Sequence, residues 1–209
     1  MAISWPCPFS VEAYAAHADR VVAPRFNCPG CGRPLSFDGS YPRQVREAGV
    51  VHAIRVPRAA CRGCGTTHAL LPDFVAYRRR DSVEAIGAAV APDAAGGRPG
   101  PLWAGVPART VRSWRSRFAE RAELLTAGLV AVATTHSGVA PILPVPALAT
   151  TLAVAAVGAA WWAASQRWPG RIARPWRFAN TITGSGLFST RVDLPWAGLR
   201  CVPCPARAP

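Results

Sequence analysis

The chain has 209 residues, seven cysteines and a formal net charge of +13, enough length for one or two small domains. An odd cysteine count fits poorly with a disulfide framework, and 11 scattered carboxylates give no cluster for a metalloenzyme. All 24 basic residues are arginine, and this cationic surplus predicts a polyanionic partner, with nucleic acid first.

The first segment, residues 1–22, predicts a short apolar helix from Val11 to Val22. Its start has neither basic residues nor an apolar run, and Glu12 and Asp19 interrupt it. We therefore expect no signal peptide and a cytoplasmic location, where a reducing environment favours metal binding over disulfides.

Four cysteines form two copies of one pattern, Cys28-Pro-Gly-Cys31-Gly and Cys61-Arg-Gly-Cys64-Gly. In such a knuckle, a tight turn directs two sulfurs at one point, and the trailing glycine takes a positive φ. Two knuckles supply four thiolates. We therefore predict one structural zinc site, with no open position for water, whose ligands are Cys28, Cys31, Cys61 and Cys64. Two unrelated cysteine pairs, joined as disulfides, are the alternative.

The stretch between and after the knuckles predicts strands. Residues 36–47 and 50–56 flank Ala48-Gly49, which indicates a hairpin, and residues 66–71 predict a third strand that Pro72 ends. This order predicts a three-stranded zinc ribbon over residues 23–77, whose folding depends on the metal. His52 and His68 are expected to face solvent or the ligands, because four thiolates already complete the site.

Residues 78–128 predict a helix-turn-helix-like region. A helix over 83–90 follows a cap at Asp81 or Ser82, residues 93–101 form a loop, and a long helix runs from Ala108 to about Gly128. Its apolar face carries Val111, Trp114, Phe118, Ala122 and Leu125, and its polar face carries Arg109, Arg112, Ser113 and Ser116.

That division is typical of a recognition helix. We expect Arg109, Arg112, Ser113 and Ser116 to face a major groove, with Arg115 and Arg117 on backbone phosphates. A solvated surface helix is the alternative.

The region 129–200 is rich in alanine and tryptophan and predicts further helices. Residues 148–164 are expected to form a buried helix that packs against the recognition helix, with a single membrane span as the alternative. Four arginines, at 167, 171, 174 and 177, lie among tryptophans; we expect a solvated surface, with phosphate contacts as the alternative. Residues 201–209 are expected to be a flexible tail, with a second metal site at Cys201 and Cys204 as the alternative.

The two cysteine patterns, the run Thr66-Thr-His-Ala-Leu-Leu-Pro72 and residues 110–118 together resemble a bacterial family that combines a zinc ribbon with a helix-turn-helix. Residues 175–187 are similar to its C-terminal segment. Members are often encoded within or near transposable elements, so the resemblance implies a zinc-dependent DNA-binding or transposition-accessory role. This chain departs from the family at Gly96–Pro101, which cannot hold the helix before the turn and leaves residues 102–104 as at most one helical turn.

The sequence therefore predicts an α+β protein in which a zinc ribbon precedes helices. We expect a DNA-binding protein that is no enzyme, acts on double-stranded DNA in transposition or regulation, and has no membrane partner. An adaptor for a transposase or ATPase, without DNA binding of its own, is the alternative.

Overall fold

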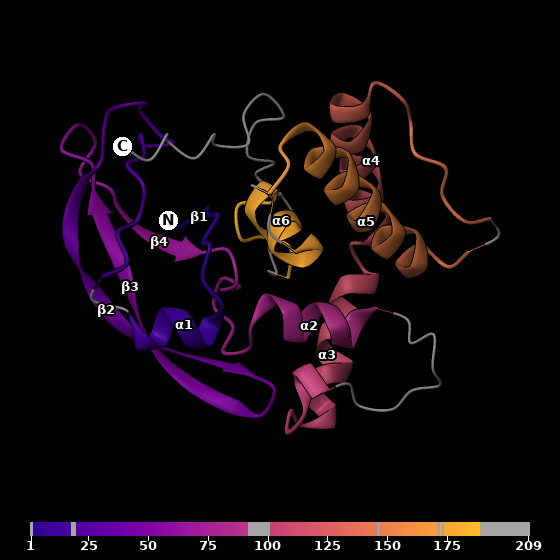
Figure 1. Ribbon diagram of the computed structural model, residues 1–209, viewed down its shortest axis with the longest axis horizontal. Helices are drawn as coiled ribbons and strands as arrows, with labels where there is room; N and C mark the ends of the chain where they lie inside the picture. Colours follow the sequence, from indigo (N-terminus) through magenta and orange to yellow (C-terminus); the bar gives the residue numbers. More distant parts are fainter. Residues whose placement is uncertain are drawn as a thin grey trace.

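A computed structural model of the chain describes residues 2–17, 20–91, 101–145, 147–170, 172 and 174–188. Within them, a four-stranded sheet lies at one end of the molecule and a group of helices at the other (Figure 1). The strands are β1 (Ala2–Trp5), β2 (Ser36–Glu47), β3 (Val50–Ala60) and β4 (Thr67–Pro72), in the sheet order β1-β4-β3-β2. The helices are α1 (Val11–Ala16), α2 (Val83–Val90), α3 (Ala108–Ala119), α4 (Ala122–Ser137), α5 (Ala149–Arg167) and α6 (Pro175–Ile182), with a 3₁₀ turn, η1 (Pro101–Trp103), before α3. The α+β prediction is confirmed at this level.

The predicted hairpin is present. β2 and β3 pair antiparallel on either side of Ala48 and Gly49, whose φ angles are 50° and 80°. Two consecutive positive φ angles are those of the tight turn that matches the twist of a hairpin. The register shifts once between Phe37 and Ser40.

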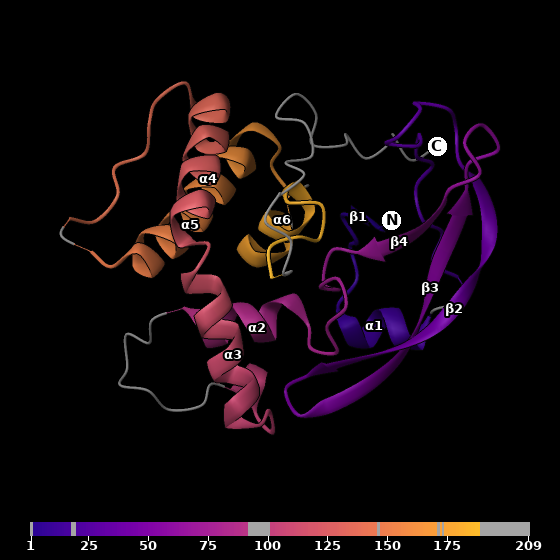
Figure 2. The ribbon, with the colours of Figure 1, turned by 180° about the vertical axis from the view of Figure 1, so that it is seen from behind.

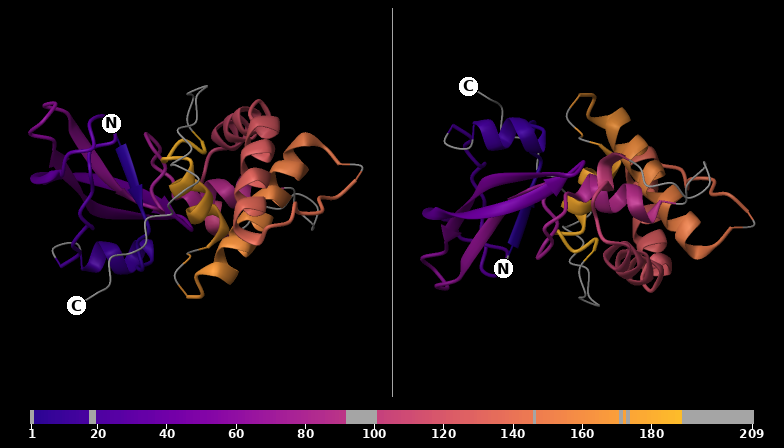
Figure 3. Two further views of the ribbon diagram at one scale, coloured as in Figure 1. Left: turned by 90° about the horizontal axis from the view of Figure 1, so that it is seen from above. Right: turned by 90° about the horizontal axis from the view of Figure 1, so that it is seen from below.

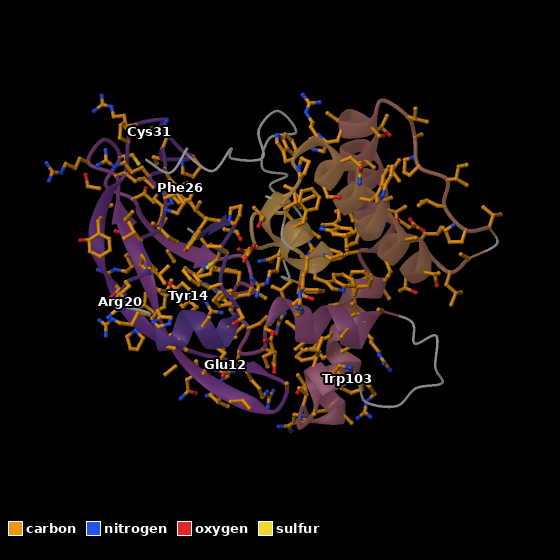
Figure 4. The ribbon with its side chains drawn as sticks, in the orientation of Figure 1. Glu12, Tyr14, Arg20, Phe26, Cys31 and Trp103 are labelled. Atoms are coloured by element: carbon orange, nitrogen blue, oxygen red, sulfur yellow. The ribbon has the colours of Figure 1, made fainter. Side chains whose placement is uncertain are left out.

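The prediction of three strands is wrong, because the N-terminal segment adds a fourth. β1 pairs parallel with β4, and the indole of Trp5 donates a 3.3 Å hydrogen bond to the carbonyl of Leu70. The N-terminal helix starts at Val11 as expected, with Ser10 as its cap, but ends at Ala16. It lies against the sheet, where the buried Tyr14 hydroxyl donates to the Arg55 carbonyl at 2.9 Å (Figure 4).

The prediction of one long helix from residue 108 to about residue 128 is also wrong. The chain instead forms α3 and α4, which are separated at Glu120 and Arg121. The guanidinium of Arg121 donates a 2.9 Å hydrogen bond to the carbonyl of Gly186. All five predicted apolar residues are nevertheless buried, at 111, 114, 118, 122 and 125.

The alanine-rich helix α5 forms close to its predicted bounds, and five of its eight alanines are buried in the core. It packs mainly against α4, with a smaller contact to α3, so the predicted packing partner is only partly right (Figure 2). In the described part of the chain, no helix combines the length and apolarity needed to cross a bilayer.

A helix-turn-helix is not seen among the described residues. α2 and α3 pack against each other, but residues 91–107 separate them, whereas the motif uses a turn of three or four residues. The loop predicted over 93–101 lies almost entirely outside the described residues, as does the tail with Cys201 and Cys204.

Buried polar groups join the sheet end to the helical end. The guanidinium of Arg177, on α6, donates at 2.8 Å to the carbonyl of Phe9 and lies 3.6 Å from the carboxylate of Asp73. The Asn180 amide, also on α6, donates to the carbonyls of Asp73 and Val75. The prediction of a solvated Arg177 is therefore wrong, because this side chain joins the N-terminal segment and the residue that follows β4 to α6. Arg167 and Arg174 are exposed as expected, and Arg171 lies outside the described residues.

Candidate metal centre and nucleic-acid interface

The four predicted zinc ligands lie together. Cys31 marks their place, at the end of the sheet away from helices α2 to α6 (Figure 4). All four sulfurs lie within 4.8 Å of one another, with Cys28 Sγ 3.6 Å from Cys64 Sγ and Cys31 Sγ 3.3 Å from Cys61 Sγ. Tetrahedral zinc with Zn–S bonds of about 2.3 Å places its sulfurs about 3.8 Å apart. The cluster therefore has the donor set and approximate spacing of a four-thiolate zinc site.

The two knuckles share one backbone hydrogen bond and one turn conformation. The amides of Gly32 and Gly65 donate to the carbonyls of Cys28 and Cys61, at 2.8 and 2.9 Å, and both glycines have the predicted positive φ. In each knuckle the first cysteine is buried and the second is exposed. This repeated geometry follows from the repeated sequence pattern.

The knuckle backbone also stabilises thiolates. Hydrogen bonds from the hydroxyl and then the amide of Thr66 lower the pKa of the Cys64 thiol to about 6. The amide of Cys64 lowers the pKa of Cys61 in the same way. Because metal ions bind the deprotonated thiol, these two shifts favour metal binding, whereas the hydrogen bond with the Cys61 sulfur raises the pKa of the Cys31 thiol to about 11.

His68, on β4, contacts a ligand rather than completing the metal site, as expected. Its ring is fully buried, and Nε2 lies 3.5 Å from Cys28 Sγ. A hydrogen bond from Nε2–H to the Cys28 thiolate would orient that ligand.

The knuckles also contact each other outside the sulfur cluster. A Cβ at Gly63, in the second knuckle, would lie 2.4 Å from the Cδ atom of Arg33, which follows the first knuckle. The Arg33 side chain therefore crosses the second knuckle at a position that only glycine can occupy without a shift.

The predicted DNA-contacting residues lie on α3, and the structure separates them into three groups. Arg109, Arg112 and Ser116 are exposed, opposite the buried Val111, Trp114 and Phe118. Ser113 and Arg117 are half-buried at the edges of this surface.

Arg115 is exposed but engaged in the fold. Its Nε donates a 2.7 Å hydrogen bond to the carbonyl of Ala89, in the last turn of α2, and its guanidinium lies 6.0 Å from the Trp103 ring centre. A cation at a helix C-terminus is stabilising, so Arg115 joins α3 to α2. Sequence periodicity placed this residue on a flank but could not reveal its partner.

Comparison with known proteins gives one finding. Residues 28–101 are similar to a domain of unknown function, DUF6431, and this stretch contains all four cysteines, the hairpin, β4 and α2. No curated protein and no solved structure matches the chain.

Proposed function

We propose that this chain is a zinc-dependent protein that binds double-stranded DNA through the exposed face of α3. The observation that supports the proposal most strongly is the two-sided character of this helix. Val111, Trp114 and Phe118 fix it to the body of the protein, which leaves Arg109 and Arg112 free to contact phosphates or guanine edges.

The N-terminus of α3 adds to this cationic surface. Pro107 stands at the cap position, and no side chain caps the helix there. The Thr110 amide donates to the Pro107 carbonyl, and the first two amides of the helix present its positive end beside Arg109. A net charge of +13 would draw DNA toward the protein from any direction.

In this proposal zinc has a structural role, and the protein catalyses no reaction. In the part of the chain that the structure describes, the four cysteines form the one cluster of three or more potential metal ligands. The family resemblance favours a transposition-accessory or regulatory purpose, and DNA binding by this chain would serve either.

The test is fluorescence anisotropy with labelled duplexes and the zinc-loaded protein, over about 50 to 200 mM salt. We expect affinity to fall steeply with salt, and an Arg109→Ala/Arg112→Ala/Ser113→Ala variant to lose both affinity and sequence preference. The control is Arg20→Ala/Arg25→Ala, which removes the same two charges from exposed positions near the sheet. Equal losses of affinity in both variants would mean that DNA binding depends on net charge and not on the exposed face of α3. If the wild type does not bind at low salt, the adaptor function replaces this proposal.

A further inference from the structure

An uncharged loop at the helical end exposes large apolar side chains. The α4–α5 loop, defined here as residues 138–145, 147 and 148, contains no polar side chain. Ile142, Val145 and Leu148 have exposed fractions of 100%, 89% and 76%. The loop runs along the edge of the molecule opposite the sheet (Figures 1 and 3). Soluble monomers rarely expose such a contiguous apolar surface.

An apolar hollow of about 520 Å³ lies beside this loop. Its walls are Ala133 and Ser137 of α4, residues 139–141 of the loop, and Gly158, Ala159, Trp162 and Ala163 of α5. Trp162, at 57% exposure, borders the hollow, and a Cβ built on Gly158 would meet no atom within 4 Å. The same surface therefore carries projecting apolar side chains and an unfilled apolar recess.

We propose that this surface is the contact between two copies of the chain, with the α4–α5 loop of each copy seated in the hollow of the other. A two-fold interface must be self-complementary, because the same patch meets itself. The projecting loop and adjacent hollow meet that requirement.

The distribution of charged residues also favours a second copy of the chain as the partner. A protein with a net charge of +13 repels its own copy over most of its surface. Residues 124–166 contain no arginine, aspartate or glutamate, so an approach through α4, α5 and their loop brings few like charges together. Such a dimer would present two copies of α3, the arrangement used to read paired half-sites. The dimer does not depend on DNA binding.

Sedimentation velocity of the zinc-loaded chain over a concentration series tests the proposal. We expect the mass to approach twice the 22.1 kDa of one chain. Ile142→Ser/Val145→Ser/Leu148→Ser should raise the dimer dissociation constant at least about tenfold. The matched control, Val22→Ser/Phe37→Ser, changes apolar residues that are 88% and 74% exposed elsewhere, and should leave the constant unchanged.

A second variant separates loss of the interface from loss of the fold. Gly158→Leu projects into open space and replaces a poor helix former with a good one, so circular dichroism and Tm should be retained while the hollow is filled. We expect it to weaken the dimer as the serine variant does. A monomeric wild type, or dimerisation unchanged in both interface variants, would overturn the proposal. A monomer that sediments with uncharged phosphatidylcholine vesicles, and no longer does so as Ile142→Ser/Val145→Ser/Leu148→Ser, would do so too and would assign the loop to a lipid surface.

Discussion

The amide of Ala48, at the turn of the β2–β3 hairpin, donates a 2.9 Å hydrogen bond to the carbonyl of Leu102, in the 3₁₀ turn before α3. The other end of this hairpin adjoins the two knuckles. One continuous element therefore connects the metal centre to the segment that leads into the cationic helix. Zinc, when bound, would fix the end of the hairpin opposite that contact.

Two substitutions in the hairpin turn should change the free energy of unfolding in opposite directions. Ala48 has a φ of 50°, where asparagine is more stable than alanine, so Ala48→Asn should raise the free energy of unfolding by about 0.5 kcal/mol. Gly49, with a φ of 80°, requires glycine, and Gly49→Ala should lower it by about 1 kcal/mol. Urea unfolding of the zinc-loaded variants measures both, and equal signs would contradict the assigned turn.

Two glycines within helices should respond differently to alanine. A Cβ at Gly87, on α2, would lie 2.3 Å from the Trp176 ring of α6, so Gly87→Ala should destabilise the fold by roughly 1–3 kcal/mol. Gly158→Ala, on α5, meets no neighbour and should stabilise it by up to about 1 kcal/mol. Thermal unfolding compares the two, and a neutral Gly87→Ala would show that α2 and α6 do not pack as described.

His68→Ala should weaken zinc binding without abolishing it. Groups that hydrogen-bond to metal ligands commonly contribute about 10- to 100-fold in metal affinity. Competition with a chromophoric chelator measures the change, and His52→Ala serves as the control because His52 lies in the hairpin away from the sulfurs. Equal affinities for the two variants would exclude the contact between His68 and Cys28.

The buried carboxyl of Asp73 should make stability depend on pH. Burial raises its pKa to about 7, although Arg177 partly offsets this effect. A folded pKa above the unfolded value near 3.9 means that the native state holds the proton more tightly, so this group lowers stability as pH rises from about 4 to 7.

Urea unfolding at several pH values, for the wild type and Asp73→Asn, isolates that contribution as the difference between the two curves. The difference should change by a few kcal/mol over the window, at most about 4 kcal/mol. Parallel curves would mean that Asp73 has the same pKa in both states. Taking the difference also removes the opposite trend caused by protonation of the cysteine thiols, which both proteins share.

Local signals allowed much of the sheet and the metal site to be predicted. The knuckles, the Ala48-Gly49 turn, the Ser82 cap and the start of α3 all follow from residues close together in the chain. The pairing of β1 with β4 joins segments more than 60 residues apart, and four residues carry too little pattern to indicate it.

The break between α3 and α4 could not be predicted from the sequence either. Ala119, Glu120, Arg121 and Ala122 all favour helix, so the interruption depends on tertiary contacts such as that of Arg121 with Gly186. The partners of Arg115 and Arg177 could not be predicted from the sequence for a similar reason. Their positions in the sequence are typical of surface arginines, and only the fold reveals that each donates to a backbone carbonyl of another segment.

The most direct test of the account is DNA binding by the zinc-loaded chain, measured by anisotropy beside the metal-free chain and Cys61→Ser, with Cys7→Ala as the control for loss of a buried thiol. We predict one zinc per chain and salt-sensitive DNA binding in the wild type and in Cys7→Ala. The Cys61→Ser variant should lose the zinc, the ribbon fold and tight binding. A full zinc equivalent in Cys61→Ser, or equal binding with and without metal, would contradict it.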